Sequence, residues 1–292
     1  MFSGTFTALV TPFRDGRIDF PAFEQLIENQ IAAGVTGIIA VGTTGESPTL
    51  SHEERQELVR VSIATARKRC LVLAGTGSNS TQHAVADTRM AEKLGADGAL
   101  LVAPYYNKPS QEGLFRHFKT IATATSLPIL LYNIPGRCGV DIAPDIVTRL
   151  ASECSNVVSI KEASGSVDRI SELRARVPEA FTILSGDDSL TLPFMSVGAV
   201  GVVSVASNLF PSEVCALVRA YQCGDVKLAF DLHRKMFPLF KDLFIEPNPV
   251  PVKTALAWRG AMSNEVRLPL CAMSDANQMR LRKTLDALER EK

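Results

Sequence analysis

The chain has 292 residues, of which 46% are hydrophobic and 21% are charged, so it can bury a large core and is typical of a globular protein. Lysine plus arginine and aspartate plus glutamate each number 31, which leaves no net charge to attract nucleic acid or an anionic membrane. The sequence begins without the basic segment and apolar run of a signal peptide, and no stretch approaches the about 20 apolar residues of a membrane span. We therefore expect a cytoplasmic protein without nucleic-acid or membrane partners.

Eight short apolar runs alternate with longer amphipathic stretches, which is the pattern of βα units around a parallel sheet. The predicted strands are Thr5–Val10, Gly37–Val41, Leu71–Ala74, Gly98–Val102, Pro128–Tyr132, Val157–Lys161, Phe181–Ser185 and Gly201–Val205. Eight strands, each followed by a helix, close naturally into a (β/α)₈ TIM barrel, whereas an open doubly wound sheet more often has about five to seven strands. The sequence therefore predicts an α/β barrel.

Helix starts are marked by serines. Ser51, Ser80 and Ser110 each precede an amphipathic stretch and are expected to cap a helix. The last of these helices is predicted over Gln111–Thr125.

The alternation of strands and helices stops after Tyr221. Residues Asp225–Phe244, Pro251–Arg259 and Asp275–Arg290 predict three consecutive helices with no strand between them. We expect residues 1–224 to form a catalytic barrel and residues 225–292 to form a C-terminal helical region packed on it.

Lys161 is the most informative residue at the predicted barrel mouth, because reacting groups in such barrels lie at the C-terminal ends of strands. It ends a strongly apolar strand, and burial would lower the pKa of its amine. A neutral amine can attack a ketone and form an imine. The alternative is a lysine that pairs with a nearby carboxylate such as Glu162.

Hydroxyl groups at other strand ends favour the imine, since its formation requires protons to move to and from oxygen. Tyr132, Thr43 and Tyr106 are the candidates. Taken singly, Tyr132 can equally be a packed core tyrosine, and Tyr105-Tyr106 can equally pack at an interface. The loop Gly42–Gly45 can hold a carboxylate through its hydroxyl and amide groups.

Metal-dependent chemistry is disfavoured. The six cysteines contain no C-x-x-C pair, and none of the four histidines has a second histidine or cysteine three or four residues away. We expect reduced thiols, no metal and no organic cofactor.

Four motifs occur in a specific order and spacing: Val41–Glu46, Pro104–Pro109, Tyr132–Arg137 and Ile160–Glu162. With these motifs the sequence resembles, over nearly its whole length, the pyruvate-dependent class I lyase family that includes dihydrodipicolinate synthase and N-acetylneuraminate lyase. The GTTGE loop, the paired tyrosines and Arg137 resemble the synthase branch, in which that arginine binds the carboxylate of aspartate semialdehyde.

The resemblance implies that Lys161 forms a Schiff base with pyruvate. It assigns a proton relay to Tyr132, Thr43 and Tyr106, with Tyr106 reaching in from a neighbouring subunit. The implied reaction joins pyruvate to aspartate 4-semialdehyde, gives 4-hydroxy-tetrahydrodipicolinate, and belongs to lysine and diaminopimelate biosynthesis.

The same resemblance implies the substrate pocket and the assembly. Thr44 would bind the carboxylate of pyruvate, and the backbone around Gly186 and Val203 would line the pocket. The enzyme would be a homotetramer built as a dimer of dimers.

Many members of this family bind lysine as a feedback inhibitor at a dimer interface. The matching residues here are Ser47, His52, Asn79 and Tyr105. Arg55 stands where sensitive forms usually carry histidine, and His83 stands where they carry the glutamate that contacts the amino group of lysine. Losing that charge-assisted hydrogen bond should weaken lysine binding, so we expect weak or absent inhibition.

Two alternatives remain open. The same Schiff-base chemistry could serve another aldehyde acceptor, as in a sugar-acid aldolase or N-acetylneuraminate lyase, and Arg137 argues against this. A non-catalytic, ligand-binding barrel is the other alternative, and the presence of Lys161, Tyr132, Thr43 and Tyr106 together argues against it.

Overall fold

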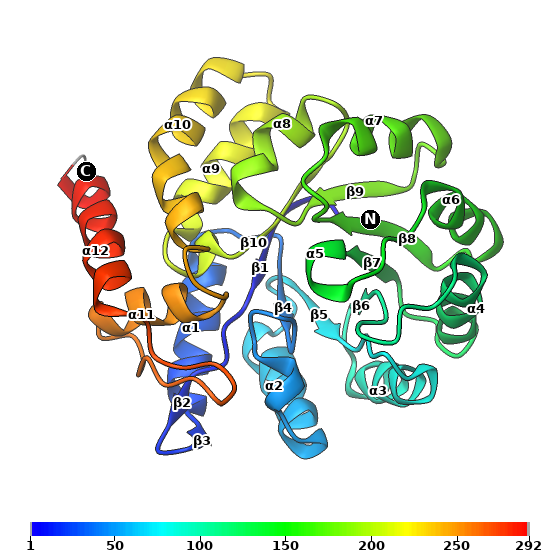
Figure 1. The fold of residues 1–292 in the computed structure, drawn as a ribbon, viewed down its shortest axis with the longest axis horizontal. Helices are drawn as coiled ribbons and strands as arrows, with labels where there is room; N and C mark the ends of the chain where they lie inside the picture. Colours follow the sequence, from blue (N-terminus) through cyan, green and yellow to red (C-terminus); the bar gives the residue numbers. More distant parts are fainter. Residues whose placement is uncertain (1, 291–292) are drawn as a thin grey trace.

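The computed structural model describes residues 2–290 and confirms the predicted barrel (Figure 1). Eight parallel strands close in the order β1-β10-β9-β8-β7-β6-β5-β4. Their bounds are β1 (Gly4–Ala8), β4 (Gly37–Ala40), β5 (Leu71–Gly75), β6 (Gly98–Val102), β7 (Ile129–Asn133), β8 (Val157–Glu162), β9 (Thr182–Ser185) and β10 (Gly201–Ser204). Each predicted strand overlaps one of these strands.

Helices surround the barrel, and the predicted serine caps are present. The helices are α1 (Phe20–Ala32), α2 (His52–Ala66), α3 (Thr81–Leu94), α4 (Gln111–Ala122), α6 (Pro144–Glu153), α7 (Val167–Arg176), α8 (Thr191–Met195) and α9 (Pro211–Gln222). Ser51 forms a capping box with Glu54 at the start of α2, and Ser80 and Ser110 accept backbone hydrogen bonds at α3 and α4. Capping satisfies amide groups that have no partner within the helix.

The strands divide their side chains between two cores. On β7, Leu130 and Tyr132 point into the barrel, whereas Ile129 and Leu131 join the larger core between strands and helices. This alternation follows from the two-residue repeat of a strand. On β8 the outward position is Ile160, so Lys161 faces the opposite side, toward the barrel axis.

One element escaped the sequence prediction. A short hairpin, β2 (Phe13–Arg14) and β3 (Arg17–Ile18), follows the first barrel strand. Two residues per strand are too few for an alternating pattern to be recognised. Asp15 and Gly16 both have positive φ, as a type I′ hairpin turn requires.

The C-terminal region is helical, as predicted, and consists of α10 (Val226–Asp242), α11 (Val250–Trp258) and α12 (Asp275–Arg290). Helix α10 packs against α9 and α12, and Figure 1 shows α12 at the outer edge of the molecule. The division at residues 224 and 225 stays a prediction. Within residues 2–290, no helix is both long and apolar enough to cross a membrane.

Candidate active site

Lys161 lies near the C-terminal end of β8 and is 5% exposed. Burial lowers the pKa of its amine from 10.5 to about 7, with Asp188 opposing that shift and Arg137 adding to it. Among residues 2–290, no carboxylate lies within 4.0 Å of this nitrogen, which instead lies 4.0 Å from the centre of the Tyr132 ring. A large fraction of the amine is therefore uncharged near neutral pH.

The alternative pairing of Lys161 with Glu162 is wrong. Glu162 is the next residue along β8 and points to the other side of the strand, where Arg169 donates to its carboxylate at 2.7 Å. The strand repeat thus separates a neutral amine inside the barrel from a buried ion pair outside it.

Tyr132 and Thr43 form the hydroxyl pair beside this amine. Tyr132, one residue before the end of β7, is the direct register partner of Lys161, and Thr43 lies close enough to its hydroxyl to lower its pKa. Burial raises the pKa of Tyr132 well above its ordinary value, while Arg137 and Thr43 oppose the shift. Tyr132 therefore stays protonated and can pass a proton between Thr43 and a group bound at Lys161.

Tyr106 is not brought into this cluster within its own chain. Its side chain is 88% exposed, and its φ of 75° lies in the left-handed region. Such a backbone is costly for a bulky residue and is found mainly where function or assembly requires it. The role expected for Tyr106 in a neighbouring subunit stays a prediction.

Thr44 and Arg137 are joined by a residue that the sequence did not indicate. The Asn248 side-chain amide donates to the Thr44 hydroxyl at 3.0 Å, and Arg137 donates to the Asn248 carbonyl at 3.3 Å. Asn248 belongs to the segment between α10 and α11, so the C-terminal region contributes directly to this site. No local pattern could have revealed a partner 204 residues from Thr44.

A buried ion pair with the C-terminal region holds the GTTGE loop in place. Lys253 on α11 lies 2.6 Å from the Glu46 carboxylate and also donates to the Thr11 carbonyl at 2.8 Å. The side chains of Lys253 and Glu46 are almost completely buried. The backbone amide of Arg267 donates to the second Glu46 oxygen at 3.0 Å, so the C-terminal region fixes this loop at two points.

Gly186 follows β9 and donates its backbone amide to the Glu162 carbonyl on β8, whereas Val203 lies on β10, one strand further around the barrel. A Cβ at Gly186 would lie 2.7 Å from the Ala163 Cβ and 3.1 Å from the Lys161 Cε, so only glycine fits there. Val203 is buried in the inner barrel core with Tyr132.

Asp188 is a second residue that the sequence did not single out. It is 2% exposed, and one carboxylate oxygen accepts from the amides of Val205 and Ala206 at 2.9 Å each. Burial raises its pKa to about 6.

The residues that match the lysine site gather around two adjoining cavities. Thr43, Ser47, Arg55, Tyr105 and Arg137 line a cavity of about 200 Å³. A neighbouring cavity of about 370 Å³ shares the side chains of Arg55 and Tyr105. It is also lined by His52, Asn79, His83 and Asp87. The cavity lined by His52 and Asn79 therefore adjoins the cavity lined by Thr43 and Arg137.

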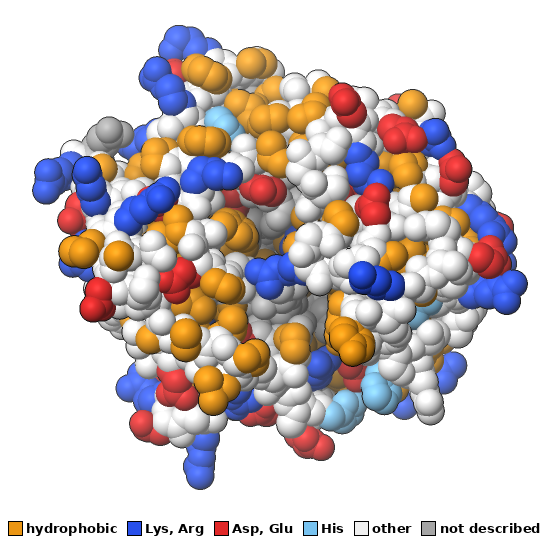
Figure 2. All heavy atoms as spheres, in the orientation of Figure 1, with side chains coloured by type: hydrophobic (Ala, Val, Ile, Leu, Met, Phe, Trp, Pro, Cys, Tyr) orange, Lys and Arg blue, Asp and Glu red, His pale blue; other side chains and the backbone are white. Residues whose placement is uncertain are grey.

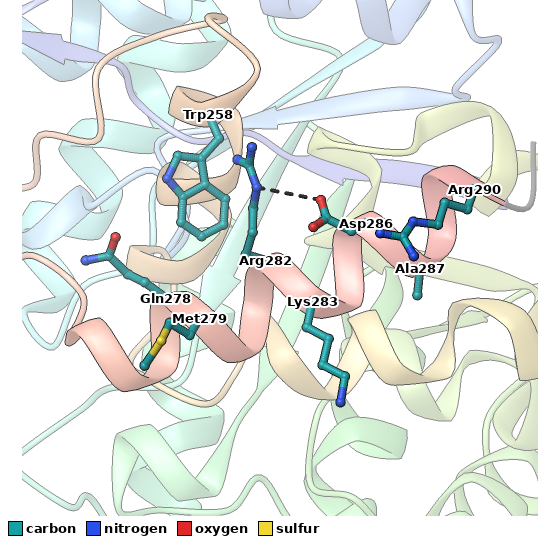
Figure 3. A pocket seen from close by; sticks show the side chains of 8 residues that line it. All are labelled: Trp258, Gln278, Met279, Arg282, Lys283, Asp286, Ala287 and Arg290. Carbon is teal, nitrogen blue, oxygen red and sulfur yellow. Dashed lines mark ion pairs between the residues drawn. The ribbon is translucent and has the colours of Figure 1, made fainter.

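The hollows that the figures show lie at two different places in the fold. Figure 2 shows a hollow near the middle of the face over the barrel, bordered by hydrophobic and basic side chains. Figure 3 shows a different hollow between α11 and α12, where Arg282 lies over the Trp258 ring and 3.6 Å from Asp286. Long, solvated side chains form that hollow. Within residues 2–290, no group of three or more His, Cys, Asp or Glu side chains is placed to hold a metal ion.

Comparison with known proteins identifies the family. Residues 1–288 match the model of the dihydrodipicolinate synthetase family. The chain belongs to this family. It is 51% identical to a 4-hydroxy-tetrahydrodipicolinate synthase of Endomicrobium trichonymphae over 285 residues, which cover 98% of each chain.

Solved structures of family members agree with the fold. The 4-hydroxy-tetrahydrodipicolinate synthase of Methylacidiphilum fumariolicum SolV is 59% identical, with a TM-score of 0.99 over 99% of this chain and 97% of that chain. A chloride-inhibited dihydrodipicolinate synthase of Acinetobacter baumannii, complexed with pyruvate, is 42% identical, with a TM-score of 0.96 over 99% of each chain. The family and the barrel expected from the motifs are thus confirmed.

Proposed function

We propose that this protein is a 4-hydroxy-tetrahydrodipicolinate synthase, a lyase that condenses pyruvate with L-aspartate 4-semialdehyde in the route to diaminopimelate and lysine. The observation that carries the proposal is the buried Lys161 amine, unpaired with any described carboxylate and placed over the Tyr132 ring. Membership of a family whose relatives carry this name supports the assignment. The Acinetobacter relative, solved with pyruvate, supports pyruvate as the first substrate.

The first half of the reaction builds an enamine. The uncharged Lys161 nitrogen attacks the keto carbon of pyruvate, and the oxygen receives a proton through the Tyr132–Thr43 pair. A second proton to that oxygen releases water and leaves the protonated imine. Loss of a proton from the methyl carbon then gives the enamine.

The second half forms one carbon–carbon bond and frees the lysine. The enamine carbon attacks the aldehyde carbon of the semialdehyde, and the aldehyde oxygen receives a proton. The amino group of the semialdehyde then attacks the imine carbon, the ring closes, and the Lys161 nitrogen departs as the amine. One water is released overall, and neither a metal nor an organic cofactor takes part.

Arg137 supports aspartate semialdehyde over a sugar aldehyde. Within the described part of the chain, Arg137 pairs with no carboxylate, and its side-chain hydrogen bond goes to the Asn248 carbonyl. Its guanidinium is therefore available for a carboxylate of the substrate, which it can bind through two parallel hydrogen bonds. A neutral sugar aldehyde offers no such partner.

Borohydride trapping with pyruvate tests the proposal directly. We expect a reduced pyruvate adduct on Lys161, located by peptide mass mapping, and turnover with aspartate semialdehyde that exceeds turnover with sugar aldehydes. An adduct on another lysine would contradict the Schiff-base role. Faster turnover of a sugar aldehyde would contradict the substrate.

We also propose the homotetramer, built as a dimer of dimers in which Tyr106 completes the site of a neighbouring subunit. The exposed Tyr106 side chain on a left-handed backbone supports this. Light scattering after size-exclusion chromatography would reveal the assembly. A fully active monomer would contradict it.

A further inference from the structure

Arg137 is carried by a loop that leaves the barrel after β7 and returns before α6. The loop contains the short helix α5 (Pro135–Cys138), which Figure 1 shows near the centre of the barrel. Arg137 itself has one long side-chain hydrogen bond, to the Asn248 carbonyl at 3.3 Å. The position of its guanidinium therefore depends on how firmly the loop backbone is held.

Asn133 joins the two ends of this loop, and we call these ends, Asn133 and Asp141–Ile142, the neck of the loop. Its side-chain oxygen accepts from the backbone amide of Ile142 at 3.0 Å, and its amide donates to the Asp141 carboxylate at 2.7 Å. The same amide donates to Glu162 at 2.9 Å. A single, completely buried side chain thus ties the beginning of the loop to its end and to β8.

Arg169 on α7 binds the neck of the loop from the helix side of the barrel. Its Nε donates to Glu162 at 2.7 Å, one terminal nitrogen donates to Asp141 at 3.2 Å, and the other donates to the Ile142 carbonyl. Arg169 is 9% exposed and Glu162 is completely buried. The planar guanidinium reaches two carboxylates and a carbonyl at once, which a lysine ammonium on a flexible stem cannot reproduce.

We propose that Arg169, acting with Asn133 and Glu162, is a positioning residue that fixes the Arg137 loop and thereby sets the affinity for the carboxylate of the aldehyde substrate. This inference rests on the proposed function. Arg169 contacts the neck of the loop and touches no group assigned to the pyruvate imine. Loosening the neck should therefore displace Arg137 more than Lys161, which is held within β8 itself.

Two variants test the role, with a control variant on α7, the helix that carries Arg169. Arg169→Lys keeps the charge but loses the three-way contact. Asp141→Ala removes one carboxylate from the neck, and because the Asp141 side chain is 50% exposed, its loss should not prevent folding. Arg176→Met is the control, since Arg176 is on the same helix and forms exposed ion pairs with Glu172 and Asp145, neither of which contacts the ends of the loop.

Steady-state kinetics should separate the two substrates. For Arg169→Lys we expect the KM for aspartate semialdehyde to rise about tenfold, because small displacements of a substrate-binding group are costly. The rate of borohydride trapping with pyruvate alone should stay within about twofold of the wild type. Asp141→Ala should show a smaller effect of the same kind, and Arg176→Met should show none.

Hydrogen–deuterium exchange provides a readout that does not depend on catalysis. Residues 134–142 should exchange faster in Arg169→Lys and Asp141→Ala, with β7 and β8 unchanged. Unchanged exchange in this segment, an unchanged KM for the aldehyde, or an equal loss of pyruvate trapping would each overturn the proposal. If the wild type forms the pyruvate adduct but does not consume aspartate semialdehyde, the proposed function fails, and the exchange data still decide whether Arg169 orders the loop.

Discussion

Lys161 and Lys253 are both buried, one at the barrel mouth and the other where the C-terminal region meets the barrel, yet only Lys161 is suited to act as a nucleophile. Lys253 lies 2.6 Å from Glu46 and donates to the Thr11 carbonyl. Lys161 has the Tyr132 ring at 4.0 Å and, among residues 2–290, no paired carboxylate.

The difference shows that burial alone does not make a reactive amine. Burial lowers the pKa of both lysines, but at Lys253 the charge and hydrogen bond of Glu46 oppose that shift. A paired ammonium stays charged and holds two segments together. An unpaired amine loses its proton near neutral pH, and its lone pair becomes available for a ketone.

The largest expected effect comes from removing the reactive amine. Lys161→Met should lower kcat by about 1000-fold or more, because the nucleophile is lost. The free energy of unfolding should stay the same or rise, since a desolvated amine is replaced by an apolar side chain. Steady-state assays and urea denaturation measure the two effects, with Lys119→Met, an exposed lysine paired with Glu153, as the control. Near-normal turnover would contradict the role of Lys161.

The same substitution at Lys253 should affect stability. Lys253→Met leaves the buried Glu46 carboxylate without its cation, so the free energy of unfolding should fall by about 3–5 kcal/mol. A second substitution, Glu46→Leu, should restore most of the loss, because it removes the unpaired charge. Denaturant midpoints of the single and double variants measure this. If Lys253→Met and the double variant were equally stable, the loss could not be assigned to the unpaired Glu46 carboxylate.

The pH dependence sharpens the comparison. Below pH about 7, the rate of pyruvate trapping should fall about tenfold per pH unit, because the neutral fraction of Lys161 falls by that factor. Between about pH 7 and 10.5 the unfolded chain binds more protons at Lys161 than the folded chain. The stability of the wild type relative to Lys161→Met should therefore rise with pH in that range. A trapping rate independent of pH would contradict the assigned pKa.

The smallest expected effect concerns lysine as an effector. Asp87 is the one carboxylate among the described residues that line the 370 Å³ cavity, and Arg55 and His52 already contact it at 3.3 and 3.4 Å. The ammonium groups of lysine would find no free anion there, so millimolar lysine should change the rate by less than about twofold. Inhibition at micromolar lysine in a steady-state assay would contradict this.

The sequence predicted the elements well because their signals are local. Apolar runs marked all eight barrel strands, and serines marked the starts of α2, α3 and α4. The hairpin β2–β3 escaped because its strands are too short to show a period. The motifs predicted the site in outline, and the structure brings Lys161, Tyr132 and Thr43 together.

By itself the sequence determined the order of strands and helices, the inward direction of Lys161 and the motifs that identify the family. Only the tertiary structure decided which polar and charged side chains pair with one another. Closure of the barrel and packing of the C-terminal region bring three pairs of side chains into contact: Glu162 with Arg169, Glu46 with Lys253, and Thr44 with Asn248. Periodicity and capping act over a few residues, whereas the last two contacts join residues more than 200 positions apart, so their partners are set by the folded geometry and not by any local pattern.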